Sequence, residues 1–217
     1  MLSYIEEKIN DMKNSDLKKI TSSVIAHYCE KLLVYPGAKS NHHSVRSGLL
    51  YHTTSMLRSA EALTMVYDFL DKDLLFAGVI LHDIGKIEEM NLSSAGLVDN
   101  YSVGGVLLGH ITQGICIVGD FGKNLGIDPE VTLLLQHMIL SHHYIPEHGS
   151  PKFPHFPEAE MLHYLDIMDA RMYDMKKAIE SADAGSFSER IRAWIIDKSI
   201  KVLYTAKTTE RNKPWVT

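Results

Sequence analysis

A histidine and an aspartate that are adjacent in the sequence, His82 and Asp83, follow eight apolar or small residues that begin at Leu74. A run of this composition belongs in a protein core, yet it carries an imidazole and a carboxylate there. Burying both groups without partners would cost several kcal/mol, so we expect them to bind something. A metal ion would satisfy both if more ligands arrive from elsewhere in the chain.

Further histidines and aspartates lie on the apolar stripes of other predicted helices, at spacings that turn them towards a core. They are His52 in a helix expected from Ser44 to about Asp71, His110 on a face shared with Val106, Gln113 and Ile117, His142 and His143 at the end of a helix capped by Asp128, and Asp166 and Asp169 in a helix opened by Pro157. Each alone fits a structural role, as a core histidine bonded to a carbonyl or as a surface acid. Together, on separate helices, they favour a shared metal site.

Imidazole and carboxylate ligands without thiolates are typical of Mn, Fe, Co, Ni or Zn, and they do not fit a structural zinc site. The candidates exceed what one ion needs, so we expect two ions with Asp83 between them. Such a pair would supply a metal-activated hydroxide and stabilise charge on a phosphoryl group. Lys86 would contact the phosphate; the alternative is a surface lysine whose stem lies along apolar residues.

The elements that position these residues are expected to be helices. Residues 1–40 should form two helices broken near Asn14, and the second has an apolar stripe of Ile20, Val24, Tyr28 and Leu32. Residues 41–180 should form the metal-site core, with 90–102 as a loop and candidate lid. Residues 187–217 should form a C-terminal helix and tail. The prediction is a single all-α domain over 1–217 with no confident strand.

The composition restricts the function classes further. A formal net charge of −5 argues against a broadly basic nucleic-acid-binding surface, although the net charge does not exclude a local basic groove. Cys29 and Cys116 lie in apolar segments without a CxxC pair, so we interpret both as reduced core residues of a cytoplasmic protein. The N-terminus has no long apolar stretch, and no run approaches a membrane span, so no membrane association is expected.

The motif order, His52, then His82-Asp83, then a late aspartate, resembles that of the HD-domain metal-dependent phosphohydrolases, in which HDIGK is a common form of the central motif. The late block resembles a DxxDA motif, which favours Asp166 over Asp169 as a ligand. The additional histidines His110, His142 and His143 resemble those of the binuclear branch. The resemblance implies an HD-domain helical bundle with a buried, binuclear metal site.

Several blocks between about residues 40 and 180 resemble the catalytic domain of the YhaM-type 3′-to-5′ exoribonucleases of Gram-positive bacteria: HHSVRSGLLYHTTSML, AGVILHDIGK, LLGHI, HMILSHH and EAEMLHYLDIMDARM. This resemblance implies Mn²⁺ dependence and release of nucleoside monophosphates from single-stranded 3′ ends. Those enzymes combine an OB-fold RNA-binding domain with the HD domain, and this sequence shows no β-rich N-terminal segment to supply one.

We therefore expect a phosphohydrolase or phosphodiesterase acting on nucleic-acid 3′ ends or small nucleotides, with Asp83 and Lys86 as catalytic residues. Its substrate would be a nucleotide or short single-stranded RNA or DNA. The alternatives are a nucleotidase or nucleotide pyrophosphohydrolase, a non-catalytic metal-dependent nucleotide sensor or partner-binding subunit, and a catalytic domain that works with a separate RNA-binding partner. The sequence leaves the oligomeric state open.

Overall fold

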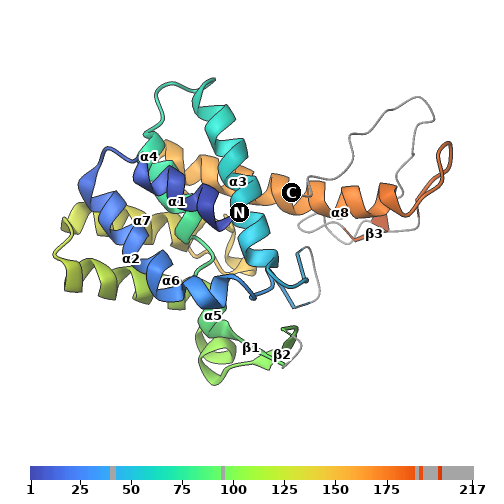
Figure 1. Ribbon diagram of the computed structural model, residues 1–217, viewed down its shortest axis with the longest axis horizontal. Coiled ribbons are helices and arrows are strands. Elements are labelled where there is room, and N and C mark those ends of the chain that lie inside the picture. The colour runs from blue at the N-terminus through green and yellow to red at the C-terminus, as the bar shows by residue number, and fades with distance from the viewer. Residues whose placement is uncertain (40–42, 94–95, 189–190, 193–199, 202–217) are drawn as a thin grey trace. The chain divides into compact units, whose positions relative to one another are not determined.

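The computed structural model describes residues 1–39, 43–93, 96–188, 191–192 and 200–201, and helices dominate this part of the chain (Figure 1). The helices are α1 (Leu2–Asn10), α2 (Ser15–Leu32), α3 (Gly48–Thr64), α4 (Lys72–Leu81), α5 (Lys86–Glu89), α6 (Val103–Leu125), α7 (Pro129–Ser141) and α8 (Pro157–Glu180), with a 3₁₀ turn at Pro146–His148. The predicted all-α class is confirmed.

The backbone divides into two compact units, Met1–Asp169 and Ala170–Thr217. Every residue of the site described below belongs to the first unit. The single domain expected over 1–217 stays a prediction.

The two N-terminal helices are present where the sequence predicts them. The apolar stripe of α2, which is Ile20, Val24, Tyr28 and Leu32, is buried as expected. Asn14 caps this helix, because its side chain accepts the backbone N–H groups of Asp16 and Leu17. On α1, the Tyr4 hydroxyl and Lys8 Nζ donate to the Glu61 carboxylate of α3 at 2.8 and 2.7 Å.

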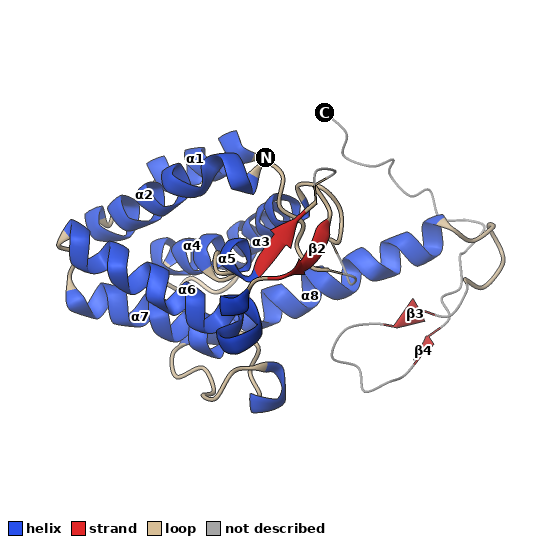
Figure 2. Ribbon diagram, turned by 90° about the horizontal axis from the view of Figure 1, so that it is seen from below, coloured by secondary structure: helices blue, strands red, loops and turns tan. Residues whose placement is uncertain are grey.

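From Leu74 to Leu81, helix α4 is buried on all sides, as its continuous apolar sequence requires. It packs against α1, α2, α3 and α7, and Figure 2 shows it enclosed by these helices. A Cβ at Gly78 would lie 2.1 Å from Met138 Cε, so the glycine allows α7 to approach closely. Asp71 starts α4 by accepting the N–H of Leu74. The chain thereby leaves α4 inside the core, at His82.

Two short strands in the first unit correct the expectation that residues 90–102 form a loop. Strands β1 (Met90–Leu92) and β2 (Val98–Tyr101) pair antiparallel. Gly96, with φ of 76°, adopts a left-handed conformation where the chain turns between them. This hairpin could not be predicted from the sequence, because β1 and β2 show little of the alternation of apolar and polar side chains that indicates a strand.

Helix α6 is kinked at Gly109, whose φ of 70° and ψ of 167° are not helical. The kink rotates the first turns relative to the rest, so Val106 is 72% exposed although the sequence places it on the inward face with His110. By length and composition alone α6 could cross a membrane, and no other described helix could. The absence of membrane association stays a prediction.

The start of α3 and the C-terminal segment also differ from expectation. Helix α3 begins at Gly48 rather than Ser44, because Ser47 has a left-handed φ of 60°. In the second unit, Ile191–Arg192 (β3) and Ile200–Lys201 (β4) pair as antiparallel strands, so the predicted helix there is wrong at these residues. This stretch is rich in isoleucine, a β-branched residue that favours strands. The rest of the predicted helix and tail lies outside the described residues.

Both cysteines are free, but neither is a core residue. Cys29 is half-buried and Cys116 is exposed. After the kink, the buried stripe of α6 is Ile111, Gly114, Val118 and Gly122, and Cys116 lies on the opposite face.

Candidate metal centre

Asp83 lies at the centre of a buried group of histidines. It follows α4 directly, and the backbone N–H of His82 still bonds to the carbonyl of Gly78. The chain then turns at Gly85, where a Cβ would lie 2.0 Å from the backbone oxygen of His110. Only glycine permits this approach between the turn and α6. The turn thus brings Asp83 and His110 together.

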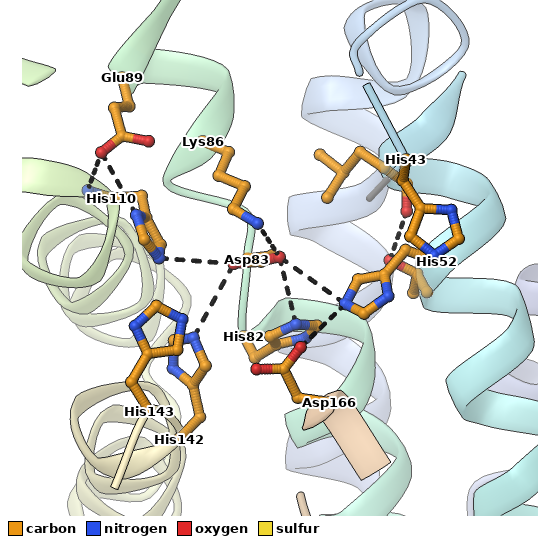
Figure 3. A network of polar contacts seen from close by, with 12 residues as sticks. His43, His52, His82, Asp83, Lys86, Glu89, His110, His142, His143 and Asp166 are labelled. Carbon is orange, nitrogen blue, oxygen red and sulfur yellow. Dashed lines mark hydrogen bonds and ion pairs between the residues drawn. The ribbon is translucent and has the colours of Figure 1, made fainter. Parts of the chain in front are cut away.

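The two carboxylate oxygens of Asp83 face different histidines (Figure 3). Oδ1 lies 3.6 Å from Nε2 of His110 and 3.9 Å from Nε2 of His142. Oδ2 lies 3.3 Å from Nε2 of His82 and 3.9 Å from Nε2 of His52. These histidines come from α3, α6 and the ends of α4 and α7, so the fold gathers them from distant parts of the sequence.

Asp166 and His143 complete the set. On α8, Asp166 Oδ1 lies 3.2 Å from His52 Nε2. His143 has a ligand atom within 4.8 Å of ligand atoms of His110 and His142, and His52, His82 and Asp83 form a second group of this kind. The structure therefore brings together all seven predicted metal ligands: His52, His82, Asp83, His110, His142, His143 and Asp166.

Backbone carbonyls fix three of the imidazole rings. The Nδ1 atoms of His82, His142 and His143 lie 2.8, 2.7 and 2.6 Å from the carbonyl oxygens of Val79, Ile139 and His148. A carbonyl can only accept, so each Nδ1 carries the hydrogen. The Nε2 lone pair of each ring is then available to a metal.

Glu89 fixes His110 in a similar way. One oxygen of Glu89 accepts the backbone N–H of His110 at 3.0 Å and lies 3.3 Å from its Nδ1. Burial raises the pKa of Glu89, but its contacts with His110 outweigh this and lower the pKa. Glu89 could not be predicted from the sequence, because an acidic residue in a four-residue helix has no periodic pattern that would place it inside.

Several buried polar atoms at the centre have no hydrogen-bond partner. Among the described residues these include Nε2 of His82, His110 and His142 and Oδ1 of Asp83. Leaving so many buried acceptors unsatisfied is costly. A divalent cation would satisfy all of them, so the residues present fit a metal.

The charge states of Asp83, His142 and His143 also suit a cation. Burial raises the pKa of Asp83, but the charge of Lys86 and the contact with His82 outweigh it and hold the pKa well below its usual range. Burial lowers the pKa of His142, and that of His143 to about 4, so both rings are neutral at pH 7. Neutral imidazoles and ionised carboxylates are the forms that bind metal.

Lys86 lies inside this group rather than on the surface. Its Nζ donates to Asp83 Oδ2 at 2.6 Å. Burial lowers its pKa, but Asp83 more than offsets this and raises it, so the ammonium stays charged. The structure thus places a buried cation beside Asp83, and the contact of Lys86 with a phosphate stays a prediction.

A second buried group adjoins His52 on the side away from Asp83. Asp169 Oδ2 lies 2.7 Å from His52 Nδ1 and 2.8 Å from His43 Nε2. Asp166 and Asp169 thus lie on opposite sides of one imidazole, which supports Asp166 as the residue that faces the centre. His43 was missed because it lies in a loop, where periodicity gives no information.

Other histidines nearby do not join the centre. His163 Nδ1 donates to the carbonyl of His142 at 2.7 Å, so it is a structural residue. His137 accepts the backbone N–H of His155, which is exposed. His148 contributes its backbone carbonyl to His143.

Comparisons with known proteins agree with this geometry. Residues 49–176 match the sequence model of the HD domain. The chain is 44% identical over 193 residues to the 3′-5′ exoribonuclease YhaM of Bacillus licheniformis and equally to that of Bacillus subtilis. The relative of the same name in Halalkalibacterium halodurans is 43% identical over 194 residues. No solved structure matches the chain significantly.

These matches cover 89% of this chain but only 60% of the two Bacillus proteins and 59% of the third. The chain therefore spans about three fifths of the length of these relatives.

Proposed function

The chain belongs to the HD-domain family, and from this premise we propose that it is a metal-dependent phosphodiesterase that hydrolyses single-stranded nucleic acid from the 3′ end. The observation that carries the proposal is the buried carboxylate of Asp83 beside His82, His110 and His142, whose Nε2 atoms have no hydrogen-bond partner. The choice of substrate is supported by the relatives, which are named as 3′-5′ exoribonucleases. For this chain the activity is a proposal, because part of the relatives' length is not matched.

We propose two ions, with one on each oxygen of Asp83. His110, His142 and His143 would hold the first with Oδ1, and His52, His82 and Asp166 would hold the second with Oδ2. Nitrogen and oxygen ligands without thiolate suit Mn²⁺, which we propose as the native metal; Fe, Co, Ni or Zn would also fit the donor set.

Bound divalent ions supply Lewis acidity, polarising the phosphoryl group and lowering the pKa of water. The chain's own residues hold the reacting groups in place. Asp83 would keep the two ions at a fixed separation, and Lys86 would offset negative charge on the scissile phosphate. Glu89 and the carbonyls behind the other rings would prevent rotation of the imidazoles.

The test combines metal-free protein with Mn²⁺ and a panel of phosphate esters: 3′- and 5′-labelled short single-stranded RNA and DNA, bis(p-nitrophenyl) phosphate, cyclic dinucleotides and mononucleotides. Stepwise shortening of the strands from the 3′ end is the expected result. Asp83→Asn should abolish it, while Asp120→Asn, which changes an exposed acid on α6, should not.

Other outcomes contradict the proposal in distinct ways. Turnover of mononucleotides alone would identify a nucleotidase. Metal binding without turnover of any ester would identify a sensor or a binding subunit.

A further inference from the structure

His43 is held in an unusual conformation by the loop between α2 and α3. Its side chain is fully buried, and its φ is 56°, in the left-handed region that non-glycine residues rarely adopt. The N–H of Gly37 donates to the His43 carbonyl at 2.8 Å. A Cβ at Gly48 would lie 1.9 Å from the same oxygen, and one at Gly37 would lie 2.8 Å from His43 Cβ. Two glycines and a strained backbone thus fix one imidazole.

The fixed ring contacts the carboxylate behind His52. A single oxygen of Asp169, Oδ2, lies 2.8 Å from His43 Nε2 and 2.7 Å from His52 Nδ1. An ionised carboxylate only accepts, so both imidazoles donate an N–H to it. Burial raises the pKa of Asp169, but the hydrogen bonds from His43 and His52 outweigh it and hold the pKa below its usual value. The carboxylate therefore stays ionised between the two rings.

Three of the other inward-facing histidines are fixed differently. The Nδ1 atoms of His82, His142 and His143 bond to carbonyls of the main chain, which cannot turn away. The Nδ1 of His52 bonds instead to a side chain on another helix, which has rotamers of its own. Asp169 can fix His52 only if its own rotamer is fixed. His43 supplies that restraint.

We propose that His43 and Asp169 are positioning residues that aim Nε2 of His52 at the metal centre. The inference rests on the proposed metal-dependent function. With a metal on Nε2, the remaining proton of His52 sits on Nδ1 and is held by Asp169. Carboxylates that hold metal-binding histidines in this way commonly raise metal affinity. Here the arrangement extends one residue further, to His43.

The experiment measures Mn²⁺ binding by isothermal titration calorimetry together with thermal unfolding of the metal-free protein. His43→Leu removes the donor, and His43→Gln restores an N–H at a similar reach. The matched control is His137→Leu, which changes a half-buried histidine on α7 outside the centre. Asp169→Asn provides a second route, because it removes the charge and changes little volume.

We expect His43→Leu and Asp169→Asn to weaken binding of one Mn²⁺ ion by about 10- to 100-fold while the number of ions bound stays the same. His43→Gln should bind close to wild type, and so should His137→Leu. If His43→Leu fails to fold, the comparison of Asp169→Asn with wild type decides the matter.

The failures are distinguishable. If the wild-type protein binds no metal and cleaves no ester, the proposed function itself is contradicted. A wild type that binds and cleaves, with unchanged affinity in both His43→Leu and Asp169→Asn, would overturn the positioning role alone. Loss of one whole ion in His43→Leu would also overturn it, since His43 would then be a ligand.

Discussion

Lys86 Nζ lies 2.6 Å from Asp83 Oδ2, inside the group of histidines. In the sequence, Lys86 follows Asp83 by three residues. The pair puts a positive charge beside the carboxylate that the proposed ions share. We propose that this lysine balances Asp83 in the metal-free protein and the substrate phosphate in the complex. This dual role would explain why the chain keeps an ammonium in a buried position.

Replacing Lys86 with methionine should separate binding from turnover. The apolar stem is kept and the charge is lost, so we expect kcat/KM to fall by about 10²- to 10³-fold, in the range found when one electrostatic contact to a transition state is removed. Mn²⁺ affinity should be retained or raised, because a competing cation is gone. Lys31→Met, which changes a surface lysine paired with Glu88, is the control. Equal loss of metal binding and turnover would assign Lys86 a structural role.

Gly85→Ala should disrupt the approach of α6 to the turn after Asp83. The added Cβ would meet the His110 carbonyl and the Gly114 N–H, which are main-chain atoms that cannot move independently. We expect the free energy of unfolding in urea to fall by about 1–3 kcal/mol, as for other overpacked sites. Gly104→Ala, where the nearest atom would lie at 3.5 Å, should change stability little. Similar stability in both variants would contradict the close packing.

Glu89→Gln should weaken the ion held by His110 more than the other. The amide keeps an oxygen for the backbone N–H but loses the charge that favours a hydrogen on Nδ1. Calorimetry should show one Mn²⁺ site weakened by about 10-fold or more, as for other carboxylates behind metal-binding histidines. Glu88→Gln is the matched control, because that neighbouring acid faces solvent. Two unaffected sites in Glu89→Gln would rule out this role.

The contact between Tyr4 and Glu61 should make stability depend on alkaline pH. Burial and the hydrogen bond to Glu61 raise the pKa of Tyr4 from 10.0 to about 12. Because the folded state favours the protonated phenol, its contribution is fully present below pH 10 and is lost as the pH rises through about 12. In urea, the free energy of unfolding of Tyr4→Phe should therefore be about 1 kcal/mol lower than that of wild type near neutral pH. The difference should shrink above pH 10.

Tyr67→Phe, which alters an exposed tyrosine, is the control for that series. A difference between Tyr4→Phe and wild type that is constant from neutral to alkaline pH would contradict the role of the phenol proton.

The sequence predicts those parts of the fold that depend on local signals. The stripe of α2, the apolar length of α4 and the Asp128-Pro129 start of α7 are all local patterns, and the structure confirms them. Histidines on regular helices could be predicted to face inward for the same reason. His52 is an example, because its neighbours on α3 are buried at helical spacing.

Features set by tertiary contacts could not be predicted in this way. The left-handed conformation of His43 depends on the close approach of Gly37 and Gly48, which no local pattern encodes. The kink at Gly109 moves Val106 away from the face of His110, so a single helical period over both residues fails. The choice between Asp166 and Asp169 likewise depends on which side of His52 each one meets.

The most direct test of the account is an anomalous difference map from crystals of the protein loaded with Mn²⁺. We predict two peaks on either side of Asp83, one against Oδ1 with His110 and His142, the other against Oδ2 with His52 and His82. A map without a peak at Asp83, from protein that nevertheless binds Mn²⁺ in solution, would contradict the proposed centre.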